Sequence, residues 1–124
     1  MFVFVNDRDT TVFELKERVH QLCLSKGWGE AGVQNPQHVA MAMTVEMSEL
    51  LEHFQWLNDG QVRALLRGED PVRAQQIGEE FADVMMYGLQ LMRALDIDVT
   101  GQMLRKIEIV QLRDNGIDAL DEKR

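Results

Sequence analysis

The sequence is poor in cysteine and in positive charge, and both shortages exclude classes of function. The single Cys23 excludes an intrachain disulfide and a zinc site built from several cysteines. Thirteen lysine and arginine residues against twenty-one acidic ones give a formal net charge of −8. Such a chain lacks the basic surface that nucleic-acid polymers or anionic membranes require. An anionic ligand would therefore need a metal cation between itself and the protein.

Long apolar runs are also missing. No segment approaches the ~20 consecutive apolar residues of a membrane-spanning helix. The charges among residues 1–9 do not fit a signal peptide. We therefore expect a cytoplasmic protein without a membrane partner, and its length fits one domain over residues 1–124.

Apolar residues recur at helical spacing through most of the chain, whereas no useful segment alternates with the period of a strand. Asn35-Pro36 and Asp70-Pro71 are typical helix starts, because the first residue caps the helix and proline fits its first turn. The sequence predicts an all-α fold with a bundle-like arrangement of four principal helices. They span about residues 9–26 (capped by Asp9 or Thr10), 35–57, 71–95 and 98–115, with a short helical turn possible at 61–67.

The stretch VEMSELLEHFQW in the second predicted helix places acids beside apolar residues. At 100° per residue, Glu46 falls inside the apolar arc and Glu49 at its edge, whereas Glu52 points away. In the third predicted helix Glu80 and Asp83 share a flank of the apolar face. Both pairs have the same spacing of three residues, so each pair lies on one side of its helix.

A buried, ionised carboxylate without compensation is too costly to persist, and four converging acids would repel one another. A solvated charge pair is the ordinary explanation of such spacing, but it does not account for an acid in an apolar arc. Two pairs facing one cleft would supply oxygen ligands to Mg²⁺, or to Mn²⁺. A di-iron site is disfavoured, because the third helix has no histidine and therefore no Glu-x-x-His motif.

Glu46-x-x-Glu49, followed thirty residues later by Glu80-x-x-Asp83, resembles the signature of the MazG-like all-α nucleoside triphosphate pyrophosphohydrolases. The resemblance runs over about residues 20–113, and EMSELLEHFQW is particularly similar to the small dCTP pyrophosphatase branch. It implies Mg²⁺-dependent cleavage of a (deoxy)nucleoside triphosphate, dCTP or a non-standard one, to the monophosphate and pyrophosphate, as in house-cleaning of nucleotide pools. All four acids match the family's metal ligands. Glu49 is our candidate for activating water, since it lies at the cleft edge.

Other family positions carry over less completely. Lys106 and Arg113 match phosphate-binding positions on the last helix, although Val110 replaces the asparagine between them. Lys106 fits a solvated lysine equally well, and Arg113 fits a surface position better. The base-binding aromatic clamp of the dCTP branch corresponds to His20, Trp28 and Trp56, with the alternative that Trp56 belongs to the core or to a subunit interface.

The third predicted helix has a second apolar row, Ala82, Met86 and Leu89, away from its main apolar face. A helix that is apolar nearly all round is buried on several sides, which predicts a homodimer or homotetramer. The resemblance implies the same states. A different class of function remains open, namely a non-catalytic helical oligomer that binds a metal or a protein partner through a degenerate site. The four intact acids argue against that alternative, and the Val110 replacement leaves it open.

Overall fold

The computed structural model describes residues 6–113, and these residues are helical with connecting loops. The five helices are α1 (Val12–Lys26), α2 (Pro36–Glu52), α3 (Asp59–Leu66), α4 (Pro71–Ala94) and α5 (Val99–Gln111). Within that range, strand pairing is limited to one isolated bridge between Glu30 and Val33. The predicted all-α class is confirmed.

Helix starts follow the predicted chemistry at two positions and depart from it at a third. The Asn35 side chain accepts hydrogen bonds from the backbone N–H groups of Gln37 and His38, and the Asp70 side chain accepts one at the start of α4. For α1 the predicted caps are wrong. Thr11 is the cap, because its Oγ1 accepts the N–H of Glu14 at 3.1 Å.

The predicted end of the second helix near residue 57 is also wrong, because α2 stops at Glu52. The next amides, from His53 onward, bond carbonyls in a tight turn, and Asn58 then starts a new helix through a reciprocal capping box with Gln61. The short turn predicted at 61–67 is therefore a helix of eight residues, α3. The last helix, which was predicted to end near residue 115, ends earlier, at Gln111.

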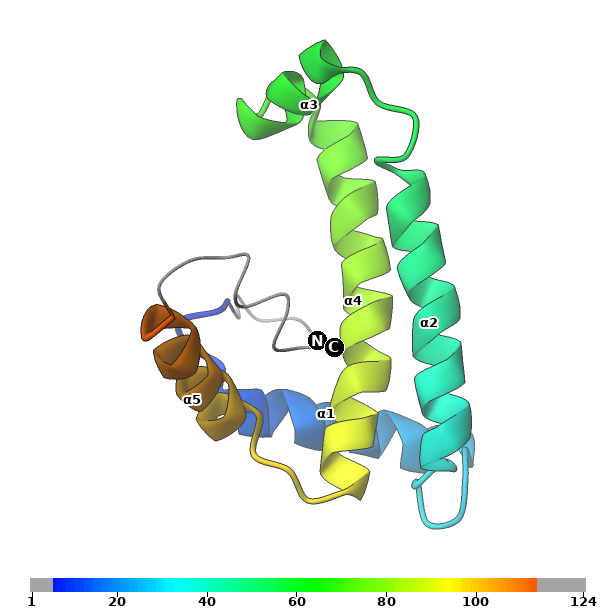
Figure 1. Cartoon of the computed structure of the whole chain (residues 1–124). Coiled ribbons are helices and arrows are strands. Elements are labelled where there is room, and N and C mark those ends of the chain that lie inside the picture. Colours follow the sequence, from blue (N-terminus) through cyan, green and yellow to red (C-terminus); the bar gives the residue numbers. More distant parts are fainter. Residues whose placement is uncertain (1–5, 114–124) are drawn as a thin grey trace.

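Helices α2 and α4 run antiparallel and side by side, as Figure 1 shows. Helix α1 crosses the C-terminal end of α4, and α5 stands away from the α2–α4 pair. A small apolar core forms at the crossing of α1 and α4, where Val19, Cys23 and Leu89 are buried. Cys23 is completely buried, and burial raises the pKa of its thiol, so it is the small core residue that its apolar row predicts.

Much of the predicted core is exposed in the single chain. Phe54, Phe81 and Leu95 recur at the apolar spacing of the second and third predicted helices, and each of the three is more than two-fifths exposed. Ala82 of the second apolar row is exposed as well, whereas Leu89 of the same row is buried. The periodicity identified the apolar faces correctly, but the described part of the chain has no further helix to cover them.

Among the described helices, none is both long enough and apolar enough to cross a membrane.

Candidate metal and nucleotide site

Three of the four predicted acids converge between α2 and α4. Glu46 comes from the middle of α2, and Glu80 and Asp83 come from one side of α4. One carboxylate oxygen from each of the three lies within 4.8 Å of the others. The antiparallel pairing of the two helices brings together residues that are more than thirty positions apart in the sequence.

Two of the three acids, Glu46 and Glu80, lack the partners that buried carboxylates normally have, whereas Asp83 is exposed. Oε2 of Glu46 and Oε2 of Glu80 are buried and accept no hydrogen bond from the described residues. Burial raises the pKa of Glu46, and the charge of Glu49 and a hydrogen bond with it raise that pKa further. Burial likewise raises the pKa of Glu80, followed by the charges of Glu49 and Asp83. The metal-free cluster is therefore held together against its own charge.

Glu49, the fourth predicted acid, lies beside this cluster. It is half-buried one turn beyond Glu46, and it affects the pKa of both Glu46 and Glu80 through its charge and through hydrogen bonding. His53, the residue that ends α2, places Nε2 at 3.9 Å from Oε1 of Glu80. His53 lies at the apolar spacing of the second predicted helix, which favours a core histidine; in the structure it is half-buried with a carboxylate neighbour.

The residues present fit a hard divalent cation. The ligand atoms are carboxylate oxygens, and two of the carboxylates have a buried oxygen without a hydrogen bond. The raised pKa values of Glu46 and Glu80 come first from burial and then from the neighbouring acids, and a bound cation would oppose both effects. An oxygen-only set favours Mg²⁺ or Mn²⁺ over softer metals.

A cavity of about 260 Å³ opens directly beside the acids. Glu46 and Asp83 form its charged end. Its other walls are aromatic, apolar or amide side chains: Trp28, Gln34, Met86, Tyr87 and Gln90. The site therefore combines a polyanion-binding end, provided that a metal is present, with a wall on which a flat ring can stack.

The loop between α1 and α2 supplies Trp28 and Gln34 to this cavity, and two glycines shape it. Gly29 has φ +72°, and a Cβ atom there would lie 2.3 Å from the backbone oxygen of Val33. Gly32 has φ +76°, and a Cβ atom there would lie 2.9 Å from Cε1 of His20. Only glycine fits these two positions without moving the loop.

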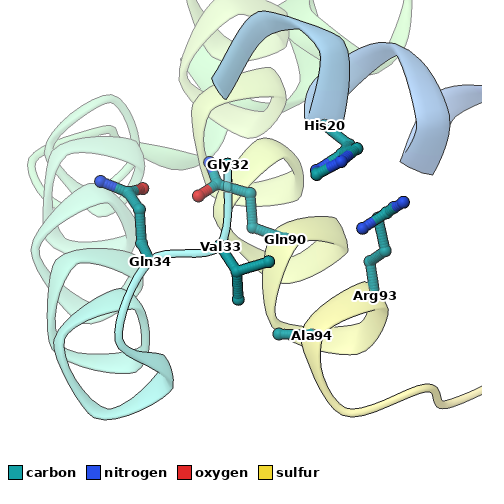
Figure 2. Close-up of a pocket in the computed structure, with 7 residues that line it drawn as sticks. All are labelled: His20, Gly32, Val33, Gln34, Gln90, Arg93 and Ala94. Atoms are coloured by element: carbon teal, nitrogen blue, oxygen red, sulfur yellow. The ribbon is translucent and has the colours of Figure 1, made fainter. Parts of the chain in front are cut away.

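His20 lines a second, much smaller cavity next to the first. Figure 2 shows this cavity, where His20 of α1 faces Arg93 of α4 across the space. It holds about 10 Å³, which is room for one water molecule. Gln34 and Gln90 belong to the walls of both cavities. His20 is thus close to the proposed base-binding region but does not line the larger cavity.

The remaining predicted site residues do not join the cluster within one chain. Trp56, in the turn after α2, is 84% exposed. Lys106 is exposed on α5, and Arg113 is half-buried just beyond that helix. Neither lines the cavity beside the acids. Val110, at the family's asparagine position, is exposed.

Four residues that line the larger cavity were not predicted as site residues: Gln34, Met86, Tyr87 and Gln90. Tyr87 and Gln90 follow Asp83 by four and seven positions, so helical periodicity alone placed them on the acid-bearing side of α4. Gln34 carried no such signal, because its position depends on the path of a loop. The spacing of His53 from Glu49, four residues, likewise placed it near the acids.

Two comparisons with known proteins bear on this site. The model of the MazG-like family matches residues 41–122, more than half of the chain and the part that contains all four acids. Human dCTP pyrophosphatase 1 is 25% identical to the chain over 105 residues, which are 85% of this chain. The match spans 59% of the length of the human protein.

Proposed function

Since the chain belongs to the MazG-like family, we propose that it is a Mg²⁺-dependent nucleoside triphosphate pyrophosphohydrolase. It converts a (deoxy)nucleoside triphosphate to the monophosphate and pyrophosphate, with dCTP or a non-standard deoxynucleotide as substrate. The observation that carries the proposal is the cluster of Glu46, Glu80 and Asp83 beside a cavity with aromatic walls. The printed name of the human relative supports dCTP.

In this proposal Glu46, Glu80 and Asp83 hold the metal, and Glu49 completes the set. A bound Mg²⁺ or Mn²⁺ would neutralise the triphosphate and lower the pKa of coordinated water. Glu49, at the edge of the cluster, orients the attacking water and accepts its proton as general base.

The nucleoside end of the substrate lies in the cavity beside the acids. Trp28 and Tyr87 offer the stacking surface. His20 lines the smaller cavity, which shares Gln34 and Gln90 with the larger one. Trp56 and Lys106 are exposed and lie outside the cavity of their own chain. We assign Trp56 to base binding, and Lys106 with Arg113 to the phosphates, in a site completed across a subunit interface.

The exposed apolar faces support association into a dimer or tetramer. Phe81 on α4 and Leu51 on α2 are each about half exposed on the long helix pair. Helix α5 also exposes apolar side chains on neighbouring turns: Met103, Leu104, Ile107 and Val110. A second copy of the α2–α4 pair would form a bundle of four helices with the first, which differs from the bundle within one chain that the sequence predicts. The biological role is house-cleaning of the cytoplasmic nucleotide pool.

The decisive test is pyrophosphate release from a panel of standard and modified nucleoside triphosphates, with and without Mg²⁺. We expect metal-dependent release together with the matching monophosphate. Glu46→Gln should reduce turnover at least about 100-fold, since even indirect support of a metal is worth 10–100-fold. Glu52→Gln is the matched control, because Glu52 is exposed on the same helix. It should retain wild-type turnover.

The same experiment addresses the alternative of a non-catalytic helical oligomer. A folded sample that binds Mg²⁺ but releases no pyrophosphate from any nucleotide would contradict the enzyme and support a metal-binding or partner-binding protein. Mg²⁺ binding is measured separately by calorimetry on wild type and on both variants. Loss of binding in Glu46→Gln but not in Glu52→Gln identifies the acid cluster as the metal site.

A further inference from the structure

The acid-bearing side of α4 continues towards its C-terminal end as the wall of the larger cavity. Asp83, Tyr87 and Gln90 follow one another at helical spacing, and all three line that cavity. Seven residues of helix separate Asp83 from Gln90, which is about 10 Å along the axis. That length is of the order of the reach from a nucleotide's phosphates to the far edge of its base. A nucleotide whose phosphates lie at Asp83 therefore presents its base near Gln90.

Gln90 has an acceptor that nothing in the described part of the chain satisfies. Its Oε1 is buried, and no hydrogen-bond donor from residues 6–113 reaches it. A buried polar atom without a partner costs free energy, so native structures rarely contain one without a reason. The oxygen needs a donor, and a turn of the amide towards the cavity that Gln90 lines would let a ligand supply one.

A second amide reaches the same place from another element. Figure 2 shows the side chain of Gln90, from α4, extending towards the side on which Gln34, from the loop before α2, lies. Both residues line the cavity that contains Trp28. On the far side, the cavity next to His20 has room only for water, so a ring cannot lie there in this conformation.

The aromatic and amide walls have different functions in recognition. Trp28 and Tyr87 present flat surfaces that stack on any base and therefore add affinity more than choice. An amide distinguishes bases, because its oxygen accepts only from a donor and its nitrogen donates only to an acceptor. The selectivity of this cavity is therefore expected to come from Gln34 and Gln90.

We propose that Gln90, with Gln34 beside it, reads the edge of the nucleobase and selects bases that carry an exocyclic amino group. The inference rests on the proposed nucleotide pyrophosphohydrolase function and names its specificity residue. The amino group of cytosine donates to Oε1 of Gln90. The carbonyl oxygen of uracil or thymine at the same position would leave two acceptors facing each other. A site built around a hydrogen bond rejects analogues that cannot make it.

The test compares three substrates that differ at the ring position of the cytosine amino group. They are dCTP, its pyrimidin-2-one analogue without the amino group, and dUTP. For wild type we expect kcat/KM to fall in that order. Gln90→Leu removes the amide and keeps a similar size. It should lower kcat/KM for dCTP between about 5-fold and 100-fold, the cost of one unsatisfied hydrogen bond, mainly through KM. Its effect on dUTP should be less than about threefold.

Matched variants isolate the acceptor. Gln90→Glu keeps an acceptor oxygen at the end of the side chain and should keep the preference for dCTP over dUTP. Gln76→Leu makes the same replacement at an exposed position of α4 outside the cavity and should change neither rate. Gln34→Leu, in the loop, tests the second amide without altering α4, and it should reduce the preference as well. Melting curves establish that each variant is folded.

Binding of dCMP and dUMP, measured by calorimetry, gives a readout that does not depend on turnover. Tighter binding of dCMP that is lost in Gln90→Leu supports the inference. If both Gln90→Leu and Gln34→Leu hydrolyse nucleotides with the wild-type ratio of kcat/KM for dCTP to that for dUTP, the inference is overturned and the pyrophosphohydrolase function stays intact. A wild-type preference for dUTP that disappears in Gln90→Leu overturns the selection of amino-bearing bases. No hydrolysis of any nucleotide and no binding of either monophosphate means that the proposed function itself has failed.

Discussion

Nε2 of His53 lies 3.9 Å from Oε1 of Glu80, at the point where α2 ends beside the middle of α4. The positive charge of a protonated His53 lowers the pKa of Glu80 and so opposes the effects of burial and of the neighbouring acids. Replacing His53 with Gln should therefore raise the pKa of Glu80 further in the metal-free protein. Carboxyl carbon NMR titration measures this shift. His38→Gln, an exposed position at the start of α2, is the control that should leave the pKa unchanged.

The raised pKa values of Glu46 and Glu80 predict the pH dependence of stability in the metal-free protein. The folded state binds more protons than the unfolded state between the ordinary glutamate pKa and the raised value. Stability contributed by these groups is therefore fully present below the ordinary value and is lost as the pH rises through the raised one. Chemical denaturation from acidic to neutral pH should follow this trend, and saturating Mg²⁺ should reverse it at neutral pH.

Removing one charge from the cluster tests the same repulsion directly. Glu46→Gln and Glu80→Gln should each raise the melting temperature of the metal-free protein at neutral pH, because they relieve like-charge repulsion without leaving a cavity. Glu52→Gln, exposed on α2, should change it little. A lower melting temperature in both cluster variants would contradict the repulsion, because it would mean that the charged acids stabilise the metal-free fold.

Glu49→Gln separates activation of water from metal binding. We expect kcat to fall about 100-fold or more, in the range typical of a lost general base. Mg²⁺ affinity should fall much less than in Glu46→Gln, because Glu49 lies beside the three converging acids. Wild-type turnover in Glu49→Gln would contradict its role as the base.

The loop between α1 and α2 can be tested at Gly29. Gly29→Ala requires a Cβ atom at positive φ and only 2.3 Å from the Val33 carbonyl oxygen, so the loop must shift and take Trp28 and Gln34 with it. KM should rise, while Mg²⁺ affinity stays near wild type because the acids lie on helices. Gly78→Ala on α4 meets no atom within 4 Å and should instead stabilise the protein by up to about 1 kcal/mol.

Association through exposed apolar faces predicts that a charge on α5 will break an interface. Ile107→Asp places a carboxylate among exposed apolar neighbours, and sedimentation should show a smaller assembly than for wild type. Arg105→Asp changes an exposed polar position of the same helix and serves as the control. A monomeric wild-type protein would contradict the proposed dimer or tetramer.

The parts of the fold that depend on local chemistry could be predicted from the sequence. Asn35-Pro36 and Asp70-Pro71 mark helix starts because a cap and a proline act within a few residues. Glu46 was identified as a candidate site residue because it interrupts an apolar arc. In the structure its carboxylate lies beside those of Glu80 and Asp83.

What the sequence missed depends on parts of the molecule that are distant along the chain. The exposure of Phe81 could not be read from periodicity, which identifies an apolar face but not whether the same chain covers it. Gln90 resembled any polar residue of a helix until the loop with Trp28 and Gln34 was placed opposite it. The departure at Thr11 arises because Asp9, Thr10 and Thr11 all have side chains that can cap a helix.

The small core at the crossing of α1 and α4 bears on how the folded fraction of this protein depends on its concentration. Among residues 6–113 only five apolar side chains are buried: Val19, Cys23, Val39, Val84 and Leu89. A chain that completes its core by associating with copies of itself is stabilised by mass action, so its unfolding midpoint rises with its own concentration. In the proposed oligomer, dilution would separate the copies and unfold the chain, so the expression level would set the folded fraction.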